Sequence, residues 1–100
     1  MRPIHLAKLD KVRPALVLTR EAIRPYLNTV TVAPITSSMR GLRTELSVGP
    51  ANGLDHESIV SCDNIRTIPV NDLGEQIGYL LSSQEPALAE ALAAAFDLED

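Results

Sequence analysis

The amino-acid sequence predicts a mainly β protein, a small β-barrel with one C-terminal helix. Short apolar or alternating runs separated by turn residues extend from residue 4 to residue 81, and an amphipathic run follows. The chain has 100 residues, of which 45% are hydrophobic and 22% charged, so residues 1–100 are predicted to form a single domain. A β-sandwich is less favoured because no strand run is long.

Three strands are predicted in the first third of the chain. Ile4–Leu9 alternates between apolar and polar residues, whereas Ala15–Thr19 is an apolar run typical of a strand buried on both faces. Arg20–Leu27 contains a proline and is expected to form a helical turn or a loop. Asn28–Ala33 is the third strand, and Pro34 is expected to end it because proline has no N–H for the ladder.

The middle of the chain predicts further short elements. Thr44–Val48 alternates cleanly, and Glu57–Cys62 supplies another strand. Asn52-Gly53 between them is a turn signal, since both residue types tolerate a positive φ. Pro69 ends a further extended piece, and Asn71–Gly74 is expected to form one helical turn.

The C-terminal helix has the clearest sequence signals. Gln76–Leu81, just before it, is compatible with a last strand or with the start of the helix. Ser82 and Glu85 have the spacing of a capping box, and Pro86 falls in the first turn, where proline is tolerated. The apolar stripe of this helix consists of Leu88, Ala91, Leu92, Ala95 and Phe96.

The net charge of −4 is unevenly distributed. Residues 1–66 hold all nine bases and six acids, a net charge of +3, whereas residues 67–100 hold seven acids and no base. A polyanion can therefore meet the first two thirds of the chain while the acidic remainder faces away. A solvated acidic helix without any functional meaning explains the same distribution.

Several classes of protein are disfavoured by the sequence. No apolar run is long enough to span a bilayer, and neither a signal-peptide core nor a glycine-rich phosphate loop is visible. Cys62 has no cysteine partner and fits a reducing compartment, so a cytoplasmic location is expected. His5 and His56 do not lie at metal-ligand spacing with Cys62, and neither a metal nor another cofactor is expected.

Hydroxyl and arginine side chains next to two predicted strands are the first candidates for chemistry. Thr36, Ser37 and Ser38 follow Pro34, and Arg13 stands where the second strand begins. Small hydroxyls and a guanidinium are good donors to phosphate oxygens. Each residue alone is also compatible with a structural role, Arg13 as a surface side chain and Thr36 as the cap of a turn.

A second candidate group follows the strand predicted at Glu57–Cys62. Asp63, Asn64 and Arg66 place an acid, an amide and a cation within four residues. Asp63 is compatible with a general base and equally with an ion-pair partner of Arg66. Two further arginines, Arg40 and Arg43, lie beyond Ser38 and extend this group of donors.

Three segments, taken together, resemble the MazF/PemK family of bacterial endoribonuclease toxins. These segments are Arg13–Leu18, Val32–Ser37 and Cys62–Ile68, and the resemblance extends over residues 4–98. The chain is most similar to the short, mycobacterial-type members. The resemblance implies an SH3-like barrel, a symmetric homodimer, and metal-independent cleavage of single-stranded RNA. It also implies a cognate antitoxin whose acidic tail covers the substrate groove.

The resemblance also implies roles for individual residues. The catalytic arginine and threonine of the family fall on Arg13 and Thr36, and an aspartate used by some members falls on Asp63. Asn64 stands where many members have glutamine. The family's long glycine-rich loop before the arginine is reduced here to Asp10–Val12, which leaves the groove less covered and leaves the identity of the general base open. Ser37, Ser38, Arg40, Arg43, Asn64 and Arg66 complete the predicted RNA-binding set.

The reaction that the resemblance implies is attack of a ribose 2′-OH on its own 3′ phosphate. Its products are a 2′,3′-cyclic phosphate and a 5′-OH end. Two other functions stay open on sequence alone, a gyrase-inhibiting toxin on the same fold and a non-catalytic SH3-like binding module. The acidic segment Phe96–Asp100 disfavours the gyrase inhibitor, which uses the end of its C-terminal helix.

Overall fold

A computed structural model describes residues 1–98; Glu99 and Asp100, two of the acids counted above, lie outside the described residues. The strands are β1 (Pro3–Lys8), β2 (Val12–Val17), β3 (Thr29–Thr36), β4 (Glu45–Val48), β5 (Ser58–Ser61), β6 (Arg66–Pro69) and β7 (Leu73–Tyr79). Short 3-10 helices lie at η1 (Arg24–Tyr26), η2 (Pro50–Asn52), η3 (Cys62–Asn64), η4 (Val70–Asp72) and η5 (Ser82–Gln84), and α1 (Glu85–Ala95) follows.

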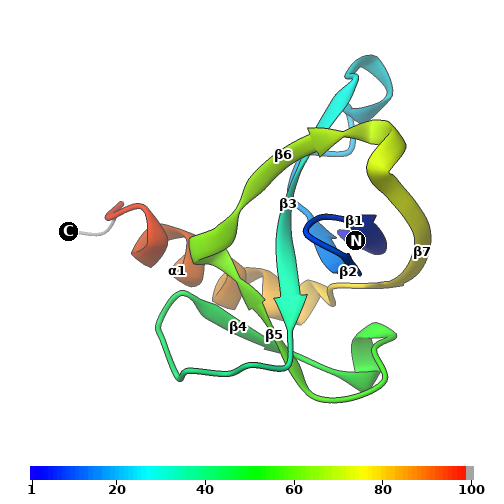
Figure 1. The fold of residues 1–100 in the computed structure, drawn as a ribbon. Coiled ribbons are helices and arrows are strands. Elements are labelled where there is room, and N and C mark those ends of the chain that lie inside the picture. Colours follow the sequence, from blue (N-terminus) through cyan, green and yellow to red (C-terminus); the bar gives the residue numbers. More distant parts are fainter. Residues whose placement is uncertain (99–100) are drawn as a thin grey trace.

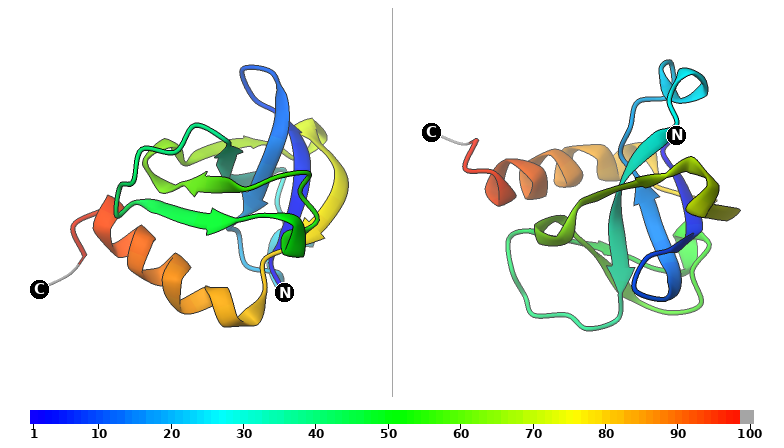
Figure 2. Two further views of the ribbon diagram at one scale, coloured as in Figure 1. Left: turned by 90° about the horizontal axis from the view of Figure 1, so that it is seen from below. Right: turned by 45° about the horizontal axis from the view of Figure 1, so that its top comes forward.

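The strands form one antiparallel sheet that curls around the core (Figure 1). Its order is β4-β5-β3-β2-β1-β7, and β6 pairs with β3 outside this path. The helix α1 packs against β4, and Figure 2 shows it lying along β4 and β5. The expected barrel-like β fold with a C-terminal helix is confirmed. Among the described strands the path stays open between β4 and β7.

Two apolar clusters lie on opposite faces of β2 and β3. The larger one joins the sheet to the helix, and Leu16, Val60, Leu80 and Leu88 are fully enclosed in it. The smaller one lies between β1, β2, β3 and β6. Both clusters are almost entirely aliphatic, and Phe96 does not contribute, because its side chain is 58% exposed. The prediction that Phe96 belongs to the packed stripe of the helix is therefore wrong.

The central strand β3 contacts three other strands and does not stop at Pro34, as the sequence suggested. Thr29–Val32 pair with β6, whereas Ile35 and Thr36 pair with β5. Pro34 lies between these two paired stretches and is paired with neither β5 nor β6. Its missing N–H therefore costs no hydrogen bond to either strand. The strand therefore continues to Thr36 and changes its partner at the proline.

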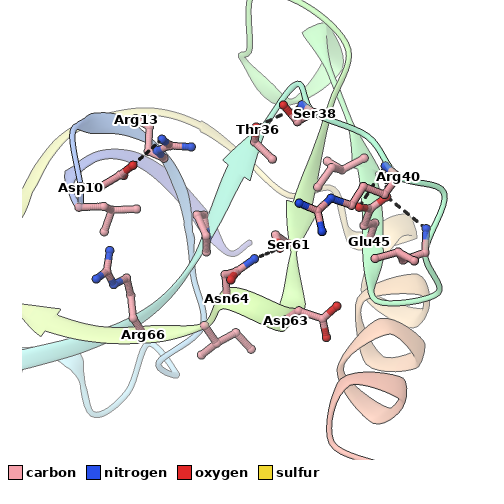
Figure 3. Close-up of a pocket in the computed structure, with 15 residues that line it drawn as sticks. Asp10, Arg13, Thr36, Ser38, Arg40, Glu45, Ser61, Asp63, Asn64 and Arg66 are labelled. Atoms are coloured by element: carbon pink, nitrogen blue, oxygen red, sulfur yellow. Dashed lines mark hydrogen bonds and ion pairs between the residues drawn. The ribbon is translucent and has the colours of Figure 1, made fainter.

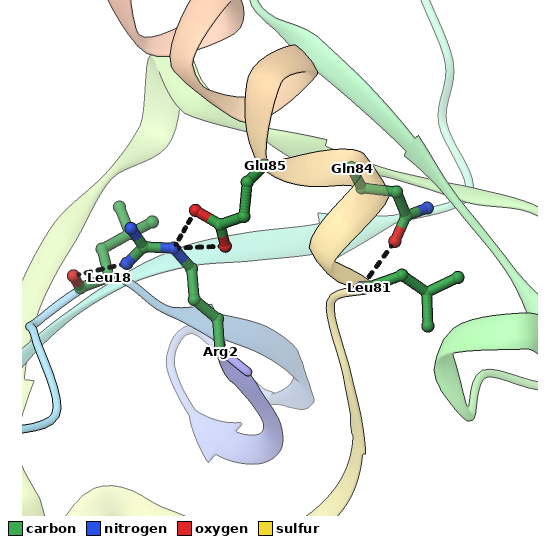
Figure 4. Close-up of polar contacts among 5 residues, drawn as sticks. All are labelled: Arg2, Leu18, Leu81, Gln84 and Glu85. Carbon is green, nitrogen blue, oxygen red and sulfur yellow. Dashed lines mark hydrogen bonds and ion pairs between the residues drawn. The ribbon is translucent and has the colours of Figure 1, made fainter.

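The beginning of the helix also differs from the prediction. No side-chain cap is formed by Ser82, which lies in η5 instead of at the helix start. The Gln84 side chain instead accepts a hydrogen bond from the Leu81 N–H at 2.9 Å, across the η5 turn that precedes α1 (Figure 4). Of the two possibilities for Gln76–Leu81, the strand is the correct one, because β7 runs to Tyr79.

An ion pair between distant parts of the chain holds the first turn of α1 against the sheet. The Arg2 guanidinium donates through Nε to both carboxylate oxygens of Glu85, at 3.1 and 2.9 Å, and through Nη1 to the Leu18 carbonyl at 3.0 Å (Figure 4). Both charged side chains are partly exposed. This pair therefore orients the helix more than it stabilises the fold.

The buried Asn52 connects the two open ends of the sheet. Its side chain, 2% exposed, accepts a hydrogen bond from the Gly49 N–H and donates to the Tyr79 carbonyl at 2.9 Å and to the Gln84 side chain at 2.7 Å. The sequence suggested only a turn at this position. The amide in fact ties the segment after β4 to the end of β7.

Replacement of Asn52 by alanine should destabilise the protein by roughly 1–3 kcal/mol, since it leaves buried partners unsatisfied. Chemical denaturation measures the change, with Asn71→Ala as the control because Asn71 is exposed. Equal stability of the two variants would show that the Asn52 network contributes nothing to folding.

Candidate active site

The pairing of β2 with β3 sets Arg13 opposite Thr36. In this antiparallel pairing, Ala15 lies opposite Pro34, Leu16 opposite Ala33 and Val17 opposite Val32. The same antiparallel register, carried two residues further, places Arg13 across from Thr36, on the same face as the Ala15–Pro34 pair. The two residues that the sequence singled out separately thus meet at one edge of the sheet.

Both side chains line an open cleft of about 730 Å³ (Figure 3). Predicted residues that also line it are Ser38, Arg40, Asp63, Asn64 and Arg66. Ser37 instead lines a second cleft, on the other side of Arg13 and Thr36, and Arg43 lines neither. Asp10, Glu45 and Ser61 line the first cleft and are residues that the sequence reasoning missed.

Arg13 is held by a carboxylate from the short turn between β1 and β2. Its Nη2 donates to Asp10 Oδ2 at 2.9 Å, while its buried Nε has no hydrogen-bond partner among the described residues. Desolvation acts to raise the pKa of Asp10, but a hydrogen bond from the Lys11 backbone and the charge of Arg13 lower it below its ordinary value. Asp10 is therefore ionised at neutral pH and orients a guanidinium that keeps free donors.

Thr36 is oriented by the turn that follows it. Its Oγ1 accepts a hydrogen bond from the Ser38 N–H at 3.2 Å, a local side-chain-to-backbone contact (Figure 3). A hydroxyl that accepts in this way still has its own proton to donate. The turn thus leaves Thr36 as a donor toward the cleft that it shares with Arg13.

The residues after β5 lie on the wall away from Arg13. Asp63 Oδ2 accepts a hydrogen bond from Thr44 Oγ1 at 2.6 Å, and Figure 3 shows the carboxylate pointing away from Arg13 and Thr36. The Asn64 amide donates to Ser61 Oγ at 2.7 Å. Arg66, in β6, points back toward Asp10 across the cleft (Figure 3).

The loop between β3 and β4 is folded around the carboxylate of Glu45. The backbone N–H groups of Arg40, Gly41 and Leu42 donate to Glu45 Oε1 at 3.1, 3.0 and 3.3 Å. Hydrogen bonds to a charged acceptor are stronger than those between neutral groups. Glu45 therefore fixes the path of the loop that brings Arg40 to the cleft.

Opposite charges are interspersed around the first cleft. Arg13, Arg40 and Arg66 face three acids, Asp10, Glu45 and Asp63. Two of the acids form hydrogen bonds with nearby groups of the same cleft. Asp10 accepts from the Arg13 guanidinium, and Glu45 accepts from the backbone of the loop that carries Arg40. The cleft is therefore a set of oriented donors and not a uniformly basic surface.

Cys62 lies beneath this site and does not suit nucleophilic chemistry. Burial, and then the neighbouring charge of Asp63, raise the pKa of its thiol to about 11, so the thiolate is scarce at neutral pH. Within residues 1–98 no group of three or more histidine, cysteine or acidic side chains is placed to hold a metal ion. None of the described helices is long and apolar enough to cross a membrane.

The curled antiparallel sheet, its C-terminal helix and a cleft with three arginines define a small β protein suited to a phosphate-bearing ligand. A family model described as PemK-like, MazF-like toxin of type II toxin-antitoxin system matches residues 3–96. The chain therefore belongs to the PemK-like, MazF-like family of toxins.

Individual relatives agree with this assignment. Endoribonuclease MazF3 of Mycobacterium tuberculosis is 68% identical over 99 residues, which are 99% of this chain and 96% of that protein. Probable endoribonuclease MazF5 of the same species is 34% identical over 85% of this chain and 79% of its own. The solved structure of the M. tuberculosis toxin MazF-mt6 has a TM-score of 0.97 at 67% identity and covers 99% of this chain and 100% of that one. The predictions of the family and of an endoribonuclease toxin are confirmed.

Replacement of Glu45 should loosen the loop that carries Arg40. In Glu45→Ala the three backbone donors lose a charged acceptor, so trypsin should cut after Arg40 and Arg43 on the order of tenfold faster. Mass spectrometry of timed digests identifies these two cuts, and Glu45→Gln should give an intermediate rate. Glu90→Ala, on the exposed face of α1, serves as the control. Unchanged cutting in Glu45→Ala would remove Glu45 as the anchor of this loop.

Proposed function

We propose that this toxin cleaves single-stranded RNA without a metal ion, at a phosphate held between Arg13 and Thr36. The observation that carries the proposal is the β2–β3 register, which sets these two side chains opposite each other at the edge of one cleft. A guanidinium and a hydroxyl in this arrangement supply donors to two oxygens of one phosphate. The site needs no cofactor for this chemistry.

The reaction is a transesterification within the RNA strand. The ribose 2′-OH loses its proton to a base as its oxygen bonds to the adjacent phosphorus, the bond to the 5′ oxygen of the next nucleotide breaks, and that oxygen takes up a proton. The products are a 2′,3′-cyclic phosphate and a 5′-OH end. The attack must be in line with the departing oxygen, a geometry that a splayed single strand reaches and a stacked duplex resists.

Arg13 and Thr36 act on the charge that develops during this reaction. Negative charge grows on the non-bridging phosphate oxygens as the fifth bond to phosphorus forms, and donors fixed in advance stabilise it without reorganisation. Asp10 fixes Arg13 at 2.9 Å, and the Ser38 N–H fixes Thr36 at 3.2 Å. Both donors are thus positioned before RNA arrives.

The two aspartates of the cleft have different surroundings. Asp10 lies against Arg13, whereas Asp63 is bonded to Thr44 on the far wall. We propose that Asp63 helps to bind and orient the RNA strand, together with Asn64, Ser38, Arg40 and Arg66. For Asp63 to act as the general base, its carboxylate would have to rotate toward the phosphate. Ser37 and Arg43 extend the same binding surface beyond the first cleft.

A cognate antitoxin with an acidic tail is the proposed protein partner. One solved structure of similar fold, at 24% identity, is described as an endoribonuclease in complex with its cognate antitoxin from mycobacterial species. Carboxylates of such a tail would compete with RNA phosphates for Arg13, Arg40 and Arg66. A symmetric homodimer and a cytoplasmic location complete the proposal, and the buried free thiol of Cys62 suits a reducing compartment.

RNA cleavage in the presence of EDTA tests the proposed chemistry. Wild-type protein should cut a long single-stranded RNA to 5′-OH fragments with or without EDTA, and should leave an oligonucleotide with 2′-deoxyribose at the cut site intact. Arg13→Ala should lower kcat/KM on the order of a hundredfold or more, because a preorganised donor is lost. Arg13→Lys should recover only part of the rate, since it keeps the charge but loses the planar fork.

Arg20→Ala is the matched control, because Arg20 is exposed and lines neither cleft. Loss of cleavage with EDTA, cutting of the 2′-deoxy substrate, or full activity in Arg13→Ala would each contradict the mechanism. Intact RNA together with inhibited DNA supercoiling would favour the gyrase inhibitor instead.

A further inference from the structure

We infer that the second cleft, beyond Arg13 and Thr36, is a subsite for the nucleobase of one nucleotide next to the scissile phosphate. The inference rests on the proposed function, because it takes the phosphate to lie between these two side chains. It concerns RNA sequence preference, which the roles proposed for Arg13 and Thr36 do not explain, since a phosphate is the same at every position.

The second cleft lies directly beside the proposed position of the scissile phosphate. It has a volume of about 480 Å³, and Arg13 and Thr36 line both it and the first cleft. The two residues therefore form the ridge between two hollows. A phosphate held on this ridge has one neighbouring nucleotide on each side, so one of the two flanking bases lies at the mouth of the second cleft.

The walls of the second cleft differ in chemistry from those of the first. The second cleft contains a group of apolar side chains, namely Leu6, Pro14, Ile35, Leu54 and Ile77. The first cleft has three arginines and three acids, which suit the sugar and the phosphates. An apolar surface with a few polar groups at its edge suits a nucleobase, whose faces are apolar and whose edge forms hydrogen bonds.

The polar edge of the second cleft comes from two connecting segments. Lys11 stands in the turn between β1 and β2, and Asp55 and His56 stand in the segment before β5. All three side chains are exposed. Together they offer a cationic donor, an anionic acceptor and an imidazole, which discriminate among base edges by their pattern of donors and acceptors.

The segment that bears Asp55 and His56 is anchored to β7. A Cβ on Gly53 would meet the Ile77 carbonyl oxygen at 2.2 Å, and a Cβ on Gly78 would meet the Asn52 carbonyl oxygen at 1.8 Å, so the two backbones touch. Asn52 adds its buried hydrogen bond to the Tyr79 carbonyl. This wall of the second cleft is therefore preformed, as a selective subsite requires.

Binding of uncleavable oligonucleotides tests the subsite separately from catalysis. The cut sequence is first read from the product ends of the wild-type protein. A fluorescent oligonucleotide with this sequence and 2′-deoxyribose at the cut site is then compared with two versions, abasic on the 5′ or on the 3′ side of the phosphate. For wild type, removal of one of the two bases should weaken binding roughly tenfold.

The double variant Asp55→Ala/His56→Ala should bind the complete oligonucleotide more weakly than wild type does. Removal of the base that matters for wild type should then weaken binding by this variant only about twofold or less. Lys11→Ala, in the turn between β1 and β2, should also reduce the loss of binding caused by removal of that base. Neither variant should change the loss caused by removal of the other base. Glu90→Gln, far from both clefts in the sequence and exposed, is the control and should behave as wild type. Thermal unfolding of each variant verifies that it is folded.

Equal abasic penalties in wild type and in both variants would overturn the subsite, while cleavage by the wild type would leave the proposed function intact. Loss of the penalties for both bases would place Asp55 and His56 in general binding and would also reject a one-base subsite. A wild-type protein that neither cuts nor binds the RNA would contradict the proposed function itself.

Discussion

The position of β3 between three other strands is the constraint on which the site depends. One stretch of β3 pairs with β6 and the next with β5, while β2 runs along the other side. Leu16 and Ala33 belong to one apolar cluster and Val17 and Val32 to the other, so a shift of the β2–β3 register by one residue would turn each side chain toward the wrong cluster. The same register sets Arg13 opposite Thr36, so burial of apolar residues positions the polar pair.

The polar contacts around the cleft are mostly between an acid and the group that it orients. Asp10 holds Arg13, and Glu45 holds the backbone of the loop with Arg40. Such contacts add little to stability where they are exposed, but they reduce the freedom of the donors that meet a phosphate. They also explain why a chain with a net charge of −4 can offer an anion-binding surface.

Local patterns predicted most of the strands and the helix, because apolar alternation and turn residues report directly on burial. They failed where tertiary contacts decided the outcome. The change of partner at Pro34 depends on β5 and β6, and the turn before the helix is closed by the Gln84 side chain, while Ser82 forms no cap. Asp10 and Glu45 were missed because each acts through a contact with a turn or loop next to a strand, and a single acid at such a position has no distinguishing sequence pattern.

A double-mutant cycle on the RNA cleavage rate tests most directly whether Arg13 and Thr36 act on one phosphate. The single variants Arg13→Ala and Thr36→Ala and the double variant are compared with wild type in single-turnover reactions on one oligonucleotide. If both side chains hold the same phosphate, the loss in the double variant should be much smaller than the product of the two single losses. Losses that multiply fully would show that the two residues act independently and would contradict the account.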